Sequence, residues 1–578
     1  MKPFSAPRTV KRAASKQLAS RLPSAITPFL IGVALLSSCT QTEKAGGPTV
    51  DAVALGGTII DAVPTNVSTL FPPAADNSLD LSIINALYDH LADIGDSLNV
   101  VGDAGFVKQL ATGWTWAADS LSIAFTINPK ARWHDGAPVI AKDVQFTFTA
   151  YADPRSGSAN PDNVANIDSV HVVDSLTAVF FFKRRTPHQF FDATYQMYVL
   201  PSHLLENIPV EKLGSDSLVA KPVGTGRFRF VQWVPGQTVE IEADTGNYRT
   251  RAKLDRVIWA MSGNASSATL SVFTGNADLY EKLNFDDLSE LPKHPNLTTL
   301  SFSEIGYSYM AFNFRDRKDH AKPHPILSDI RVRRALTMAI DREKMVRSVF
   351  DTFATVGIGP SPRSVFQDAA LLKPIPFDIA HARALLDSAG WILPPGKTVR
   401  VKNAVPLAIE MVTQASSQPR KQYATTLEQQ FKAIGVSATA KAVPPQGMRL
   451  VAMNRDFDLL LWANTLTPGL LGMPGSWGTN GSGNLGGYSD PDFDVTLDGA
   501  LNANSPTVAR PLWLRAMQLI TDDAAAVWIY EESTIELLHR RIRPAALRHD
   551  MFLAHLADWA IDPAQRIARD RPPTRGRN

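Results

Sequence analysis

The stretch from Leu110 to Phe148, LATGWTWAADSLSIAFTINPKARWHDGAPVIAKDVQFTF, encodes a strand, a turn and a helix in direct succession. Its apolar residues alternate with small or hydroxyl residues, which is the period of a half-buried strand, at Ile123, Phe125 and Ile127. The Asp135-Gly136 pair that follows Trp133-His134 indicates a turn. Asp143 then precedes apolar residues at helical spacing, so we predict a helix that Asp143 caps. The segment is typical of a mixed α/β domain.

Further short motifs follow one another along most of the chain: GGTII at 56–60, VLPSHLL at 199–205, PVGTG at 222–226, GNY at 246–248, GNAD at 275–278 and DIRVRRA at 329–335. In this order, and together with the WHDG segment, they resemble the solute-binding proteins of ABC importers in family 5, which includes peptide, nickel and opine binders. The resemblance implies an α/β fold of the large periplasmic-binding-protein class. Such a fold has two lobes hinged around a central cleft and an inserted third domain.

The resemblance also implies a discontinuous domain organisation, because the family's chain crosses between its lobes more than once. We expect a lipoprotein signal peptide at 1–38, a flexible tether at 39–55, lobe I at 56–88, 222–303 and 528–565, an inserted domain at 89–221, lobe II at 304–527 and a disordered basic tail at 566–578. The tail is rich in Arg and Pro and lacks an apolar face.

The amino-terminal segment has the pattern of an export signal. Its first residues carry only basic charges, and the apolar stretch 25–36 is too short to span a bilayer. This stretch ends at Leu36-Ser37-Ser38-Cys39, which resembles the bacterial lipobox, so we expect cleavage before Cys39 and lipidation of its thiol. Several acyl chains together would anchor the protein stably to a membrane. The alternative is a cleaved soluble export signal with an incidental cysteine.

Composition excludes several classes of function. The chain has 58 Lys and Arg against 56 Asp and Glu, so nucleic acid is not an expected partner. No nucleophile elbow, zinc-protease motif, phosphate-binding loop or paired-cysteine spacing occurs. We therefore predict no catalytic residues, no metal site and no cofactor, and expect His134 and Asp135 to belong to a structural turn.

In proteins of the resembling family, loops and an aromatic strand line a cleft that closes on the ligand. By this resemblance the candidate ligand-binding residues are Phe71, Tyr307, Tyr309, Trp462, Asn464, Trp477 and Asn480. For each of them, core packing or loop structure is the alternative role. Trp462, for example, follows an apolar run and could end a buried strand.

One departure concerns the ligand. Peptide binders of the family commonly place an aspartate shortly after the tryptophan that matches Trp462, where it pairs with the ligand's ammonium group. Here residues 463–472 read ANTLTPGLLG and contain no acid. A buried ammonium without a counter-charge costs several kcal/mol. Free-amino peptides are therefore less certain as cargo, unless the acid comes from elsewhere, such as Asp456, Asp458 or Asp490.

These observations predict a lipid-anchored, extracytoplasmic and monomeric solute-binding protein. It would deliver an oligopeptide or related small solute to the permease subunits of an ABC importer, without chemistry. A lipoprotein that senses a ligand without transport is one alternative. A surface-anchored hydrolase is another, and it would require a nucleophile and base that the sequence does not display.

Overall fold

The computed structural model describes residues 55–570 except 216, 218 and 467. The predicted signal peptide and lipidated Cys39 lie outside these residues, as does the tether up to residue 54. None of the described helices is long and apolar enough to cross a membrane.

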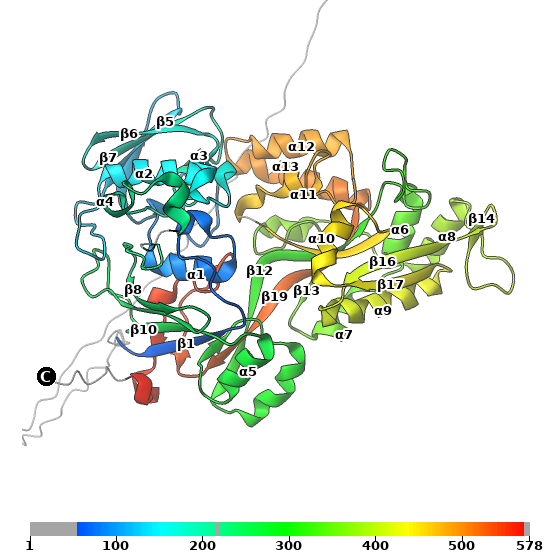
Figure 1. Ribbon diagram of the computed structural model, residues 1–578. Helices are drawn as coiled ribbons and strands as arrows, with labels where there is room; N and C mark the ends of the chain where they lie inside the picture. Colours follow the sequence, from blue (N-terminus) through cyan, green and yellow to red (C-terminus); the bar gives the residue numbers. More distant parts are fainter. Residues whose placement is uncertain (1–54, 216, 218, 467, 571–578) are drawn as a thin grey trace, which may run out of the picture. The chain divides into compact units, whose positions relative to one another are not determined.

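An eleven-stranded mixed sheet runs through the described part of the chain (Figure 1). In spatial order its strands are β17 (Ser437–Val443), β16 (Ala408–Gln414), β18 (Leu459–Thr465), β12 (Leu297–Phe312), β19 (Ala526–His539), β11 (Leu279–Tyr280), β1 (Thr58–Val63), β10 (Arg256–Met261), β9 (Thr238–Ala243) and β8 (Phe228–Val234), with β13 (Thr355–Val356) on β19. β1 begins within the GGTII motif at 56–60, and β8 and β9 form an antiparallel hairpin.

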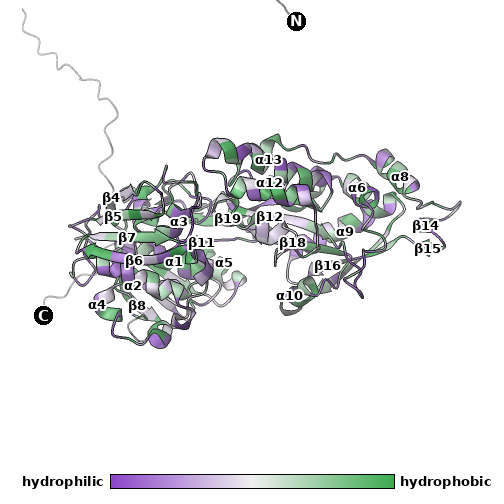
Figure 2. Cartoon of the chain, turned by 90° about the horizontal axis from the view of Figure 1, so that it is seen from above, coloured by the Kyte–Doolittle hydropathy of each residue, from purple (hydrophilic) through white to green (hydrophobic). Residues whose placement is uncertain are grey.

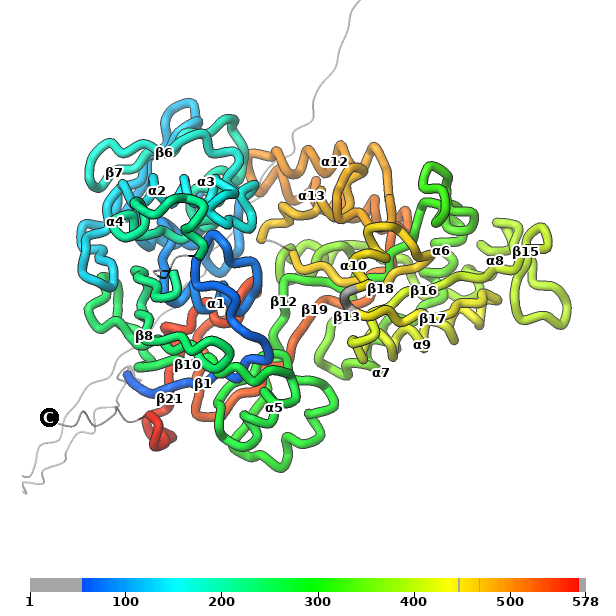
Figure 3. Tube along the Cα trace, viewed as in Figure 1, coloured from blue at the N-terminus to red at the C-terminus, as the bar shows by residue number. Residues whose placement is uncertain are grey.

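Two long neighbouring strands, β12 and β19, join the two halves of this sheet, and the trace in Figure 3 follows them from one half to the other. The amino-terminal part of β12 pairs with the part of β19 that contacts β11. The carboxyl-terminal part of β12 pairs with β18, from Gly306 opposite Thr465 to Phe312 opposite Leu459. The pairing of β12 with β19 shifts register between Ser303 and Tyr307 and again after Ser308. Such irregularities bend and twist a strand pair locally.

Helices cover both faces of each half of the sheet. In the first half, α1 (Ser78–Leu87) packs on the face of β1 that carries Ile59, and α5 (Ala265–Phe273) on the face that carries Ala62. In the second half, Met310 and Phe312 of β12 pack with α6 (Ile330–Met338), α7 (Arg342–Phe350), α8 (Ile379–Ser388) and α9 (Gln418–Ala433). This division follows from the alternation of side chains along a strand.

The opposite face of the second half is covered by α10 (Pro445–Met453), α11 (Met473–Trp477), α12 (Pro491–Leu501) and α13 (Pro506–Asp522), which pack against Tyr307, Tyr309 and Ala311. Figure 2 shows both hydrophilic and hydrophobic segments along α12 and α13, as expected for helices with one buried face.

A second, four-stranded antiparallel sheet contains the first part of the segment 110–148. Its order is β4 (Ala111–Trp116), β5 (Ser122–Ile127), β7 (Thr177–Phe182) and β6 (Ile167–Asp174), with α2 (Ala141–Ala152) packed against it. The alternating residues Ile123, Phe125 and Ile127 are fully buried, which confirms the predicted strand. This sheet shares one continuous hydrophobic core with β1, β10 and α1.

The remaining short elements are α3 (Gln189–Ala193), α4 (Ser202–Leu205), and the strand pairs β2 (Ala92–Asp93) with β3 (Val107–Lys108), β14 (Val401–Lys402) with β15 (Val405–Pro406), and β20 (Ile542–Arg543) with β21 (Ala560–Ile561).

The WHDG turn is a structural junction. The ring of His134 accepts a hydrogen bond from the Gly224 amide at Nδ1 (3.1 Å), so its Nε2 carries the proton and donates to the Gly226 carbonyl (3.0 Å). A Cβ on Gly224 would lie 1.9 Å from the Leu87 carbonyl oxygen, so only glycine permits this approach. Asp135 instead accepts from His203 at 2.8 Å. The turn therefore joins the second sheet to the loop before β8.

The prediction that Asp143 is the N-cap residue of the following helix is wrong. The helix begins at Ala141, and Asp143 is its third residue, whose carboxylate reaches back to the Ile140 amide at 2.9 Å. The same carboxylate accepts a hydrogen bond from Trp133 Nε1 (3.1 Å) and two from Ser202. A buried carboxylate is retained where several donors converge on it. Asp143 therefore stabilises both the helix start and the turn.

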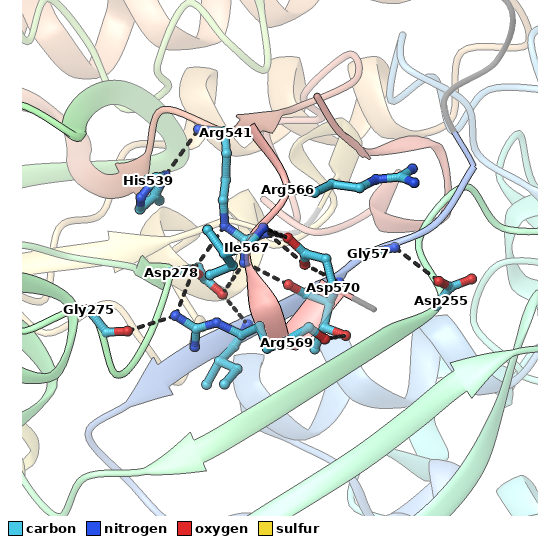
Figure 4. Close-up of polar contacts among 12 residues, drawn as sticks. Gly57, Asp255, Gly275, Asp278, His539, Arg541, Arg566, Ile567, Arg569 and Asp570 are labelled. Carbon is cyan, nitrogen blue, oxygen red and sulfur yellow. Dashed lines mark hydrogen bonds and ion pairs between the residues drawn. The ribbon is translucent and has the colours of Figure 1, made fainter. Parts of the chain in front are cut away.

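The carboxyl-terminal segment differs from the expected tail. Residues 566–570 pack beside β1, and the buried Arg541 binds both Asp278 (2.8 Å) and Asp570 (2.7 Å), as Figure 4 shows. Asp570 also accepts a hydrogen bond from the backbone amide of Thr58 at 2.9 Å. The composition of this segment predicts disorder, but one acid within it completes a buried ion network that composition does not reveal. Residues 571–578 lie outside the described part.

Candidate functional site

Four of the seven candidate binding residues lie together in the second half of the sheet. Trp477 Nε1 donates to the Tyr307 hydroxyl at 2.7 Å, and Asn464 Nδ2 donates to the same oxygen at 3.1 Å. The Tyr309 hydroxyl donates to Asn464 Oδ1 at 3.5 Å, and its ring centroid lies 5.2 Å from that of Trp477. We call Tyr307, Tyr309, Asn464, Trp477 and Trp528 the aromatic cluster.

Trp528 is the member that the sequence analysis did not propose. It lies opposite Tyr309 in the pairing of β12 with β19, and its ring is 5.1 Å from Trp477 and 5.8 Å from Tyr307. In the sequence, Trp528 could be recognised only as an aromatic residue near the start of a long apolar segment. Because only the strand pairing brings this residue beside Tyr309, sequence spacing alone does not single it out.

The aromatic cluster is apolar, neutral and enclosed. The three members Tyr307, Tyr309 and Trp477 expose 4% or less of their surface. Burial raises the pKa of Tyr307 to about 12, against the opposing effect of hydrogen bonds from Trp477 and Asn464. Burial, with the neighbouring Tyr307, also raises the pKa of Tyr309. Both phenols are therefore protonated at neutral pH, and the cluster offers hydroxyl and amide dipoles rather than charge.

The other three candidates occupy different environments. Trp462 lies opposite Tyr309 in the pairing of β12 with β18 and is half-buried against the same core. Phe71 is 1% exposed and belongs to the core of the first half of the sheet. Asn480 is exposed and lines a surface pocket with Pro474 and Asp498. The structure therefore brings together four of the seven and leaves Phe71 and Asn480 apart from them.

The three acids considered as substitutes for the missing aspartate all have partners within the protein. Asp456 binds Arg317 at 2.7 Å. Asp458 accepts from His324 (3.1 Å) and from the Glu410 amide (2.8 Å), while Asp490 caps α12 through the Phe493 amide (2.6 Å). Since each carboxylate is already engaged, none of them is free to face a ligand beside the aromatic cluster.

The described residues contain no group of three or more His, Cys, Asp or Glu side chains arranged to hold a metal ion. The arrangement of the aromatic cluster permits binding through apolar contact and a few oriented polar groups.

Comparison with known proteins identifies the family. Residues 105–483 match the model of the bacterial extracellular solute-binding proteins, family 5. The chain is 25% identical over 437 residues to the oligopeptide-binding protein AppA of Bacillus subtilis, covering 75% of this chain and 77% of that protein.

Solved structures show the same fold. The ABC transporter substrate-binding protein CtaP of Listeria monocytogenes superposes with a TM-score of 0.75 at 21% identity, covering 88% of this chain and 99% of that one. NikA of Brucella suis, solved with Fe(III)-EDTA, gives 0.74 at 17% identity, covering 87% and 100%. The predicted two-lobed α/β fold is thus confirmed, and the hydrolase alternative is wrong. The chain belongs to family 5 of the bacterial extracellular solute-binding proteins and is a binding protein, not an enzyme.

Proposed function

We propose that the protein is a lipid-anchored component of an ABC importer that captures an oligopeptide or a related small solute by closure of its two lobes. The observation that carries this proposal is the pair of strands β12 and β19. They join the two halves of the sheet, and their register shifts lie where the halves meet. A short irregular segment in otherwise regular strands is the kind of place at which a hinge motion is absorbed.

Contacts between the halves support this reading of the hinge. A Cβ on Gly469 would lie 2.2 Å from a methyl group of Val100, and Val100 shares a small apolar cluster with Ile305. The halves therefore touch through a small apolar surface beside the irregular strand segment. Small interfaces of this kind are compatible with opening and closing. We propose that the lobes expected from the family pattern, with lobe II at 304–527, move about a hinge at this position.

The binding surface follows from the position of the aromatic cluster. Tyr307, Tyr309 and Trp528 lie on the two strands that carry the register shifts, and Gly306, within the first shift, directly precedes Tyr307. We propose that the seven candidate residues, joined by Trp528, line the ligand site once the lobes close. The solute would be held by aromatic contact and by the Tyr307 and Asn464 dipoles. Binding to the closed form alone would make closure the signal for the permease subunits.

A decisive experiment is native mass spectrometry of the full chain purified from its own membrane without denaturation, with fragmentation of any bound solute. A co-purified peptide, together with compaction on rebinding in small-angle X-ray scattering, supports the proposal. A bound solute that causes no compaction would contradict closure. In the same host, Cys39→Ala is expected to release the protein from the membrane, and retention of the variant would contradict lipid anchoring.

A further inference from the structure

A group of carboxylates lies on neighbouring strands of the first half of the sheet, near the register shifts. Its members are Asp61 of β1, Glu281 at the end of β11, Glu304 of β12, and Glu532 and Glu536 of β19, and we call them the sheet carboxylates.

Strand register brings them together. Asp61 lies opposite Leu279, and Tyr280 lies opposite Leu537, so Glu281 follows directly beside Glu536. Side chains two residues apart on a strand share a face, so Asp61, Glu281 and Glu536 point to the same side of the sheet.

The buried end of this group lacks partners. Asp61 is 1% exposed, and neither of its carboxylate oxygens has a hydrogen-bond partner among the described residues. Glu536 is also 1% exposed, and its Oε2 is likewise unpaired within the described part of the chain. Buried carboxylates elsewhere in this protein, such as Asp143 and Asp570, accept several hydrogen bonds. Unpaired buried carboxylates are costly, so these two need an explanation.

The other end of the group reaches solvent. Lys282 forms an ion pair with Glu304 at 2.8 Å, with 57% of the lysine side chain exposed. Glu281 and Glu532 are half-buried between this pair and the buried end. A second cation near the group among the described residues is Arg420 of α9, which lowers the pKa of Glu532 and also donates a hydrogen bond to Gln414. Within the described part of the chain, the group therefore holds five carboxyl groups beside two cations, Lys282 and Arg420.

The group borders β12 on the face of the sheet that α9 covers. A Cβ on Gly306 would lie 3.2 Å from Oε2 of Glu532 and 3.0 Å from the carbonyl oxygen of Asn464. Because Gly306 directly precedes Tyr307 and successive side chains of a strand alternate, Glu532 lies on the face of β12 opposite to Tyr307. The loop after Trp462 carries no acid, and the three acids considered as its substitutes are engaged elsewhere.

We propose that the sheet carboxylates supply the counter-charge for a cationic group of the solute, a primary ammonium or a guanidinium. This inference rests on the proposed function and assigns the bound solute a positive charge. The carboxylates then neutralise the charged end of the solute. Charge-assisted hydrogen bonds to a buried acid provide both affinity and discrimination against neutral analogues.

Isothermal titration calorimetry with four peptides tests the proposal: Ala-Lys-Ala and Ala-norleucine-Ala, each with a free or an acetylated amino terminus. The acetylated pair differs only in the side-chain ammonium, and the norleucine pair only in the terminal ammonium, so the comparison identifies which cation binds. We expect the cationic member of at least one pair to bind about tenfold tighter or more. Asp61→Asn and Glu536→Gln should remove this preference.

Asp168→Asn is the matched control, because Asp168 is exposed on β6. Circular dichroism verifies that the variants fold. If the variants at the buried positions do not fold, the affinities of the unaltered protein for the cationic and neutral peptides test the inference. Equal affinity for charged and neutral peptides, or equal loss of both in the variants, would overturn this inference while leaving peptide binding intact. If none of the four peptides binds, the peptide function and this inference both fail.

Discussion

Replacement of Asp570 by Asn tests whether the carboxyl-terminal segment stabilises the edge of the sheet. Asp570 accepts two hydrogen bonds from Arg541 (2.8 and 2.7 Å) and one each from the amides of Thr58 (2.9 Å) and Ile567 (2.8 Å). Asparagine has nearly the same shape but removes the charge, which leaves the buried Arg541 with Asp278 as its remaining acid.

The size of the effect follows from these contacts. Breaking a buried ion pair by removing one partner costs about 3–5 kcal/mol. Since Arg541 keeps Asp278, the lower end, about 3 kcal/mol, is the expected loss, and this corresponds to an opening of β1 that is about 100-fold more frequent.

Hydrogen–deuterium exchange of the segment that contains β1 measures this opening directly, which avoids assuming that a chain of this size unfolds in one step. The matched control is Asp562→Asn, because Asp562 pairs with Arg543, whose side chain is 67% exposed. Solvent screens such a pair, so exchange of β1 should change little in the control. Equal exchange rates in the two variants would refute the reasoning.

The same variant carries a pH signature. Although burial raises the pKa of Asp570, hydrogen bonds from the Thr58 and Ile567 amides and from Arg541 outweigh it and lower the pKa below its usual value. A lowered pKa means that the carboxylate stabilises the folded state above the pKa of the unfolded chain, and that this contribution disappears as the pH falls through the folded value. The difference between the two proteins should therefore be constant near neutral pH and shrink in acid.

Three further predictions concern the site, its pH dependence and the fold. Tyr307→Phe leaves two buried donors unpaired, so affinity for the co-purified solute should fall about tenfold by calorimetry, and an unchanged affinity would contradict a role in binding. Burial and Glu281 raise the pKa of Glu536 to about 8. The folded state therefore holds this proton more tightly than the unfolded chain, and the protein should lose stability as the pH rises from the pKa of an unfolded glutamate to about 8. Urea titrations at several pH values should show this loss in the unaltered protein but not in Glu536→Gln. The same dependence of stability on pH in both proteins would refute the prediction. Gly224→Ala places a methyl group against the Leu87 carbonyl and should lower the melting temperature, whereas Gly113→Ala, with open space around it, should not.

Local patterns predicted the secondary structure well where the chemistry is local. The alternation around Phe125 predicted a buried strand, because burial on one face imposes its own period on a segment. The predicted cap at Asp143 was displaced, since its carboxylate serves a tryptophan and a serine that lie elsewhere in the chain. Tertiary partners therefore decided that position.

The sequence by itself indicated the family, the strand and helix of the WHDG segment and, through the family resemblance, four members of the aromatic cluster. These depend on motifs and periodicities that each segment carries alone. Only the tertiary structure revealed Trp528 beside Tyr309, Asp61 beside Glu281 and Glu536, and Asp570 on Arg541. The reason is that β12 and β19 pair segments far apart in the chain, and a pairing register has no signature within either strand.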